Sequence, residues 1–154
     1  MTGNHHVSLG YYPRDWQKSC HQNRKRFTVL ALHRRAGKTE LAIMELLDHC
    51  LRFNQELGLF FYVAPFLKQA KAIAWARVKS RLKPLRDFDA VTINESELSV
   101  TFKHNGCVLR IFGADNDAAM RGVRLDGVVI DEVANIDPDT WYEVLQPTLA
   151  DRNG

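Results

Sequence analysis

Apolar residues along this chain gather in short runs with the length and composition of buried strands. RFTVLAL (26–32) and LFFYVAP (59–65) are rich in β-branched and aromatic residues, and VVID (128–131) is a third run of this kind. None of the three alternates strictly between apolar and polar positions, so both faces of each strand are expected to be covered. Such strands are typical of a parallel sheet.

Longer stretches with helical periodicity follow the first two runs. KTELAIMELLDHCLRF (38–53) has apolar residues on more than one face, as expected for a helix packed on a sheet. LKQAKAIAWARVKSRLK (67–83) predicts a second helix that ends at Pro84. Strands alternating with helices predict an α/β fold in which helices flank a mainly parallel β-sheet.

One segment interrupts this alternation with a different period. SVTFK and CVLRIF flank His104, Asn105 and Gly106, and an Asn-Gly pair between β-rich runs is a strong hairpin signal. We therefore expect a β-hairpin insertion near residues 98–112. After the last strand, a polar turn and a short helix around Trp141 are predicted.

Composition adds few constraints to this picture. The chain has 154 residues, of which 45% are hydrophobic and 25% charged, as expected for one soluble globular domain. The N-terminus has no basic-then-apolar signal architecture, and the longest apolar run is far short of the ~20 residues that a membrane span needs. Three widely spaced cysteines favour a reducing, intracellular setting.

Charge is distributed unevenly between the two halves of the chain. Residues 1–86 carry 16 lysines and arginines against 5 acids, whereas residues 87–154 carry 5 against 13. A basic first half suits a polyanionic partner, and an acidic second half suits metal and water chemistry. The alternative is that the two halves pair with each other in the fold.

The sequence LHRRAGKTE (32–40) carries the first candidate chemistry. Its Gly37, Lys38 and Thr39 end a phosphate-binding loop between a predicted strand and a predicted helix, although Leu32 occupies the position of the usual first glycine. In such a loop the backbone N–H groups of Arg35, Ala36 and Gly37 hold phosphates, the lysine reaches the β- and γ-phosphates, and the threonine hydroxyl serves Mg²⁺. The alternative is a chance Gly-Lys-Thr tripeptide.

The run GVVIDE supplies a second element. Asp131 ends an apolar strand and can hold Mg²⁺ through water, while Glu132 can accept a proton from the attacking water or orient it. Two solvated acids at a strand end are a common alternative. Both elements in this order favour an ATPase that uses ATP and Mg²⁺.

With these motifs in view, the chain resembles the N-terminal ATPase domain of phage terminase large subunits, the DNA-packaging motors. The similarity lies in PRDWQ, HRRAGKT, YVAPFLKQAK and GADNDAAMRGVRLDGVVIDEV, which extend over nearly the whole chain. It implies a P-loop NTPase-like fold and one partial ATPase domain over residues 1–154, with the nuclease domain of the family absent. It also implies double-stranded DNA, a portal protein and a small terminase subunit as partners of a homo-oligomeric ring in the bacterial host cytoplasm, and no membrane association.

The resemblance also suggests roles for individual residues. A basic residue four positions before the lysine is typical of these motors, which makes Arg34 a candidate for stabilising charge on the γ-phosphate in cis, a role that Arg35 could share. Gln17 resembles the family's adenine-recognition glutamine. Arg121, with Arg124 as the alternative, is a candidate for reaching a neighbouring subunit's nucleotide.

Some of the candidate residues also have a plainer structural explanation. Arg121 and Arg124 could instead pair with local acids such as Asp115, Asp117 or Asp126. Tyr12 or Trp16 could stack on the base, although an aromatic residue in a hydrophobic core is the more common situation.

The segment from residue 66 to 86 holds seven lysines and arginines and no acid. On an α-helical wheel the lysines fall on one side and would suit sequence-independent DNA binding; they are Lys68, Lys71, Lys79 and Lys83. A solvated helix face is the alternative.

Two other functions remain open at this stage. One is a different P-loop enzyme acting on nucleic acid, such as a helicase-like translocase. The other is a truncated module that binds nucleotide without hydrolysing it.

Overall fold

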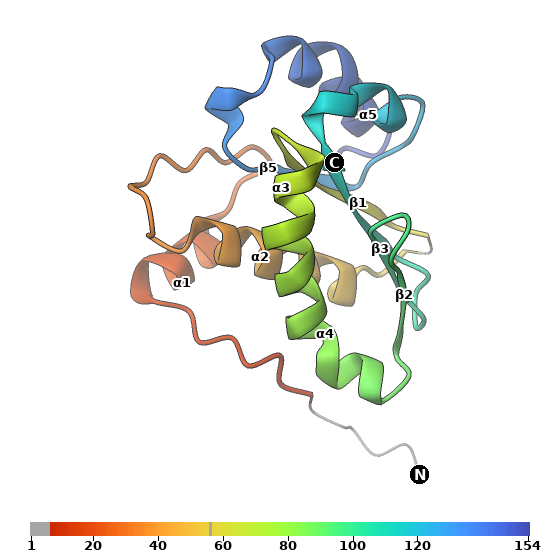
Figure 1. Cartoon of the computed structure of the whole chain (residues 1–154). Coiled ribbons are helices and arrows are strands. Elements are labelled where there is room, and N and C mark those ends of the chain that lie inside the picture. Colours follow the sequence, from red (N-terminus) through yellow and green to blue (C-terminus); the bar gives the residue numbers. More distant parts are fainter. Residues whose placement is uncertain (1–6, 56) are drawn as a thin grey trace.

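The computed structural model describes residues 7–55 and 57–154. The strands of these residues form one mixed sheet in the order β2-β3-β4-β1-β5 (Figure 1). β1 is parallel to both β4 and β5, whereas β2, β3 and β4 form an antiparallel meander. The predicted hairpin is the β3–β4 pair, with Ser99 opposite Arg110. The bounds are β1 (Leu59–Ala64), β2 (Val91–Asn94), β3 (Ser99–Phe102), β4 (Val108–Gly113) and β5 (Gly127–Ile130).

Helices lie on both sides of this sheet, as the α/β prediction requires (Figure 1). No helix in the described part of the chain is long and apolar enough to cross a membrane. The α-helices are α1 (Asp15–Asn23), α2 (Lys38–Arg52), α3 (Leu67–Ala70), α4 (Ala76–Asp87) and α5 (Gln146–Ala150). Shorter turns are the π-helices η1 (Lys71–Trp75) and η4 (Thr140–Leu145) and the 3₁₀ segments η2 (Ala114–Met120) and η3 (Val133–Asn135).

Alternate residues of the central strands build a separate apolar core on each face. Phe60 and Tyr62 of β1 lie in the cluster that includes Leu47 of α2 and Leu82 of α4. The residues between them, such as Phe61, point to the opposite face and join a second cluster. Because the side-chain period of a strand is two, both cores fix the register of β1, and the strand is buried along nearly its whole length.

The prediction of a strand at residues 26–32 is wrong. This segment is irregular, and its apolar side chains are exposed, with Val29 at 87% and Phe27 at 55%. Local hydrogen bonds replace strand pairing. The Thr28 hydroxyl accepts from the backbone N–H of Lys25 and donates to the Lys25 carbonyl, and the Lys38 ammonium donates to the carbonyl of Leu32. A strand exists only where its backbone finds a partner, and among the described residues this segment has none in the sheet.

The second predicted helix also differs from expectation at two points. It continues past Pro84 to Asp87: the fixed φ of proline is compatible with a helix, and although Pro84 donates no backbone hydrogen bond, its carbonyl still accepts one from the N–H of Phe88 at 3.3 Å. It also contains the π turn η1 between α3 and α4. A π turn takes more residues per turn than an α turn, so it offsets the faces before and after it, which a wheel drawn with one period cannot show.

α1 docks onto α2 through a cluster of ionisable groups around Glu45. The Glu45 carboxylate contacts His21 of α1, His49 one turn along α2 at 3.2 Å, and Arg24 at 3.0 Å. Burial alone would raise the pKa of Glu45, but the hydrogen bonds from His49 and His21 and the charge of Arg24 outweigh it. The pKa of Glu45 is therefore lowered from its ordinary value of 4.5.

This shift predicts an acid-sensitive contribution to stability. Because the folded-state pKa of Glu45 lies below the unfolded value, the contribution is present above about pH 4.5 and is lost as the pH falls through the folded pKa. Glu45→Gln is expected to lower the free energy of unfolding by about 1–2 kcal/mol at pH 6. The difference from the wild type should shrink on acidification.

Urea unfolding measured between pH 3 and pH 7 tests this expectation. Glu143→Gln, which changes an exposed residue of η4, is the matched control and should follow the wild-type curve. A constant difference between Glu45→Gln and the wild type across the range would show that the Glu45 charge is not involved.

Candidate nucleotide site

The N-terminus of α2 meets the carboxyl end of β5 at a single hydrogen bond. The Thr39 hydroxyl donates to Oδ2 of Asp131 at 3.0 Å, although the two residues lie 92 positions apart. Thr39, Asp131 and Glu132 line one small cavity, together with Tyr62 and Gln69. The structure therefore brings together the threonine of the predicted loop and both acids of the predicted strand end.

Backbone conformation explains how each element presents its polar group. Gly37 has a φ of 96°, a left-handed conformation that turns the chain directly into α2 at Lys38. At the other end of the site, the backbone N–H of Asp131 still donates to the Val63 carbonyl at 2.8 Å. Glu132 then adopts a φ of 51°, which is rare for a residue with a side chain and ends the strand.

Two residues that sequence reasoning missed complete the cavity. Tyr62 is 2% exposed, and its hydroxyl donates to Oδ2 of Asp131 at 2.6 Å. The Gln69 side chain donates to Glu132 at 3.4 Å. The sequence does show a tyrosine, Tyr62, within an otherwise apolar strand and a glutamine, Gln69, shortly after it. Only the pairing of β1 with β5, however, brings Tyr62 beside Asp131.

The basic residues of the loop lie apart from this cavity. The Lys38 ammonium turns back onto its own loop, where it donates to the carbonyls of Leu32 at 2.8 Å and His33 at 2.9 Å. Arg34 and Arg35 are exposed, and Arg35 has a left-handed φ of 61°. The loop thus satisfies the lysine internally and leaves both guanidinium groups on the surface.

α1 holds the loop from the other side. Gln17 is 4% exposed; its carboxamide accepts from the Arg14 backbone at 2.8 Å and donates to the Gly37 carbonyl at 3.2 Å. Arg14 itself donates to the carbonyl of Ala36 at 3.2 Å. Both polar ends of Gln17 are therefore used within the protein, against the turn that precedes Lys38.

The expectation that Tyr12 belongs to the core is wrong, because its side chain is 88% exposed. Its neighbour Tyr11 packs against the core instead, and in an extended segment adjacent side chains point in opposite directions. Trp16 is partly exposed.

Comparisons with known proteins agree with this architecture. Residues 31–153 match the family described as terminase large subunit, T4likevirus-type, N-terminal. The chain belongs to this family. It is 29% identical to the terminase large subunit of Thermus virus P23-45, over 95% of this chain and 33% of the relative, so it spans about a third of that relative's length.

Solved terminases share the fold. The large terminase ATPase domain of Thermus phage P74-26 superimposes with a TM-score of 0.82 at 28% identity, covering 95% of this chain and 63% of that one. The large terminase of a thermophilic bacteriophage, solved in complex with ADP, gives a TM-score of 0.61 at 18% identity over 76% of this chain and 29% of that one.

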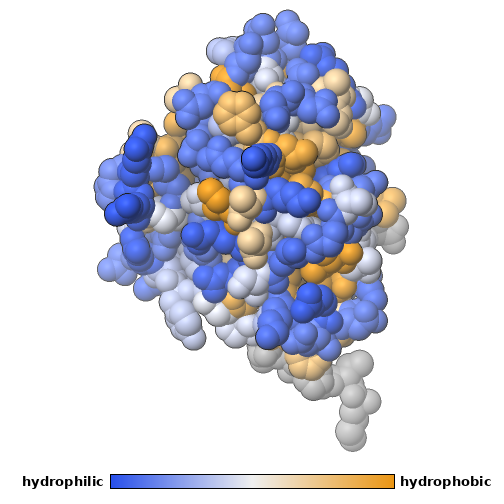
Figure 2. Space-filling model, in the orientation of Figure 1, coloured by the Kyte–Doolittle hydropathy of each residue, from blue (hydrophilic) through white to orange (hydrophobic). Residues whose placement is uncertain are grey.

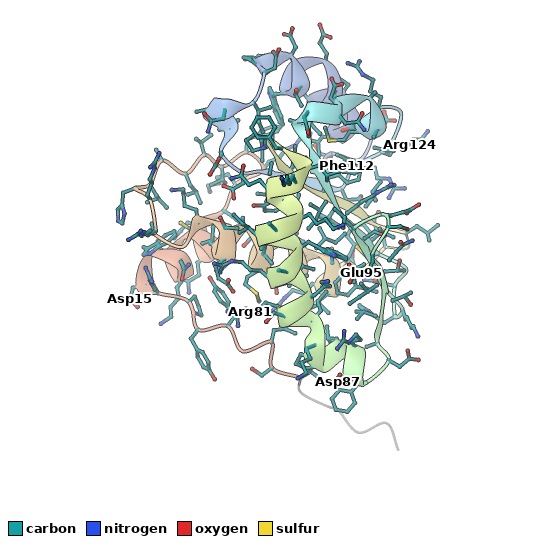
Figure 3. The ribbon with its side chains drawn as sticks, in the orientation of Figure 1. Asp15, Arg81, Asp87, Glu95, Phe112 and Arg124 are labelled. Atoms are coloured by element: carbon teal, nitrogen blue, oxygen red, sulfur yellow. The ribbon has the colours of Figure 1, made fainter. Side chains whose placement is uncertain are left out.

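In this terminase chain, Glu40 links the first turn of α2 to the basic helix α4. Glu40 lies in the first turn of α2, immediately after Thr39, and its side chain is 15% exposed. It accepts hydrogen bonds from Arg77 at 2.8 Å and Arg81 at 2.6 Å, both on α4. Arg81 also donates to backbone carbonyls of the N-terminal segment, and it lies on the opposite side of α4 from Glu95 (Figure 3).

The four lysines predicted to bind DNA have different surroundings. Lys79 pairs with Glu95 at 2.7 Å, which is the one ion pair between the basic and acidic halves among the described residues. Lys68, Lys71 and Lys83 are exposed and form no ion pair within the described part of the chain. The face of the molecule that carries α3 and α4 is mostly hydrophilic, with apolar patches small and scattered (Figure 2). The basic half therefore keeps most of its positive charge at the surface.

Both candidate trans arginines form ion pairs within this chain. Arg121 contacts Asp117 at 3.2 Å, one helical turn away, and Arg124 contacts Asp151 at 3.3 Å. Both arginines remain at least half exposed, at 51% and 70%. Such exposed pairs contribute at most about 1 kcal/mol, so a stronger anion could replace either acid.

Proposed function

We propose that this chain forms part of the ATP-hydrolysing motor domain of a terminase large subunit, and that residues 1–154 belong to one ATPase domain. The observation that carries the proposal is the 3.0 Å contact between Thr39 and Asp131, with Glu132 in the same cavity. Membership of the terminase family and the likeness to the Thermus phage ATPase domain support the same activity.

Phosphate binding would use the backbone around the start of α2. The N–H groups of Arg35, Ala36 and Gly37 and the positive end of the helix dipole suit an anion there. Lys38 would exchange the carbonyls of Leu32 and His33 for phosphate oxygens, which offer a full negative charge in place of a dipole. Gln17 would read the adenine edge after releasing Gly37, since its carboxamide offers both a donor and an acceptor.

The residues present suit a magnesium ion. Mg²⁺ prefers hard oxygen ligands, and the Thr39 hydroxyl and the Asp131 carboxylate already meet at one point of the cavity. Thr39 and Asp131 are the residues proposed to hold it, the aspartate through water. When bound, the ion supplies positive charge beside the β- and γ-phosphates.

Hydrolysis would proceed by in-line attack of water on the γ-phosphate. Glu132 is proposed to orient this water and accept its proton. Arg34, with Arg35 as the alternative, would offset the charge that develops on the transferring phosphoryl group, and Lys38 would contribute from the loop. Arg121 of a neighbouring subunit would add a second guanidinium in trans after leaving Asp117.

The purpose of this hydrolysis would be the movement of double-stranded DNA into a procapsid. Lys68, Lys71 and Lys83 are proposed to contact phosphates, and Lys79 to join them when it leaves Glu95. A homo-oligomeric ring, the portal protein and a small terminase subunit are the proposed protein partners. The proposed location is the bacterial host cytoplasm, with transient docking at the procapsid.

Binding of nucleotide without turnover is the second candidate function. The observations that favour it are the Gln69 hydrogen bond to Glu132 and the engagement of Lys38 by its own loop. In this arrangement the water-orienting carboxylate and the phosphate-binding ammonium both have partners within the protein.

Turnover by the chain and by its Glu132→Gln variant separates these functions. An ATPase predicts that the substitution lowers phosphate release at least about 100-fold, because a general base contributes that much, while nucleotide affinity stays within a few fold. Glu143→Gln is the matched control and should leave turnover unchanged. Phosphate release no faster than in buffer by all three proteins, with nucleotide bound, would support the binding module instead.

DNA binding by the basic segment predicts a change in salt dependence. Replacing Lys68, Lys71 and Lys83 together by glutamine should reduce the slope of log affinity against log salt by about 2–3, since each phosphate contact contributes about 0.9. Anisotropy of a labelled 20-base-pair duplex between 50 and 200 mM salt gives this slope. Lys103→Gln, which removes a lysine of the hairpin, is the control. An unchanged slope for the triple variant would remove the segment from the interface.

A further inference from the structure

The two oxygens of the Asp131 carboxylate accept hydrogen bonds from different donors. Oδ1 accepts from the backbone N–H of Glu132 at 3.0 Å. Oδ2 accepts two hydroxyl hydrogen bonds, from Thr39 at 3.0 Å and from Tyr62 at 2.6 Å. One of these hydroxyls belongs to the loop that is proposed to bind nucleotide, and the other belongs to the sheet.

Tyr62 is fixed far more firmly than Thr39. It lies in β1, paired with Val129 of the neighbouring strand β5, and its side chain belongs to the larger apolar core. Its aromatic ring therefore cannot shift without disturbing close-packed neighbours. Thr39, by contrast, lies in the first turn of α2 and is partly exposed.

The Tyr62 hydroxyl is also held in its donor form. A phenol O–H carries one proton and a carboxylate oxygen can only accept it, so Tyr62 is the donor in this contact.

We propose that Tyr62 is a positioning residue that holds the Asp131 carboxylate in place for the divalent cation that accompanies the nucleotide. This inference rests on the proposed function. When the Thr39 hydroxyl turns to the cation, Asp131 loses that hydrogen bond, and Tyr62 remains as the side-chain donor that fixes the orientation of Oδ2. Hydrogen bonds behind a metal-ligating group commonly contribute about 10–100-fold in metal affinity.

The substitution Tyr62→Phe isolates this hydrogen bond, because it keeps the ring and removes only the hydroxyl. Mn²⁺ serves as the probe in place of Mg²⁺, and the free Mn²⁺ signal in electron paramagnetic resonance reports the bound fraction in the presence of ATPγS. Tyr62→Phe should weaken Mn²⁺ binding about tenfold. Binding of ATPγS in EDTA should stay within twofold of the wild type.

Three further variants make the outcome specific: Tyr142→Phe, Asp131→Asn, and Asp131→Asn combined with Tyr62→Phe. Tyr142→Phe removes an exposed hydroxyl from η4 and should bind Mn²⁺ as the wild type does. In an Asp131→Asn background, Tyr62→Phe should cause no additional loss of Mn²⁺ affinity, since the residue acts through that carboxylate.

The possible results separate this inference from the proposed function. Unchanged Mn²⁺ affinity in Tyr62→Phe would overturn the positioning role, and so would an equal loss of ATPγS binding in EDTA, which indicates general structural damage. A full additional loss in the Asp131→Asn background would also overturn it. If the wild type bound no ATPγS under any condition, the proposed function itself would fail, and this inference with it.

Discussion

The hydrogen bond between Thr39 and Asp131 is the constraint on which the account of this chain depends. A hydrogen bond to a charged group contributes only about 1.5–3 kcal/mol, which is too little to bring together two segments 92 residues apart. Packing must do that: α2 lies on the face of the sheet that carries Tyr62, and the parallel pairing of β1 with β5 sets where Asp131 emerges. The contact is therefore a consequence of the fold, and the proposed chemistry uses it.

Polar contacts around the loop connect this point to the rest of the chain. Gln17 and Arg14 hold the carbonyls just before α2, and Glu40 attaches the first turn of α2 to Arg77 and Arg81 of the basic helix. The ends of this network are the N-terminal segment and α4. A rearrangement of the loop on binding phosphate would thus have direct contacts through which to reach the proposed DNA-binding surface, without passing through the apolar core.

Sequence patterns were sufficient where local rules decide the outcome. The hairpin follows from Asn105 and Gly106. The position of Thr39 follows from a helix that starts after a glycine, and that of Asp131 from an apolar strand that ends in acids. Spatial neighbours were not predictable in this way. Tyr62 and Gln69 acquire their partners from the order of strands in the sheet and from the helix that follows β1, which no spacing along the chain encodes.

Where prediction failed, a nonlocal or rare feature decided the structure. The run at 26–32 has the composition of a strand, but composition does not supply a pairing partner. The carbonyl of its last residue, Leu32, accepts a hydrogen bond from the Lys38 ammonium instead. The lysines of the basic segment were placed on one stripe of a continuous α-helix, but a π turn interrupts this helix between Lys68 and Lys79, and Lys79 pairs with Glu95. Among the described residues this is the one ion pair between the two halves, so the acidic half neutralises little of the basic half.

A crystal structure of the chain with ADP, beryllium fluoride and Mg²⁺ tests the central claim most directly. The account predicts that the phosphate analogue lies at the start of α2, that the Lys38 ammonium leaves the carbonyls of Leu32 and His33 to contact it, and that Thr39 and Asp131 flank the cation. A nucleotide bound elsewhere, or bound at this loop with Asp131 and Glu132 out of reach of the phosphate and its cation, would contradict it.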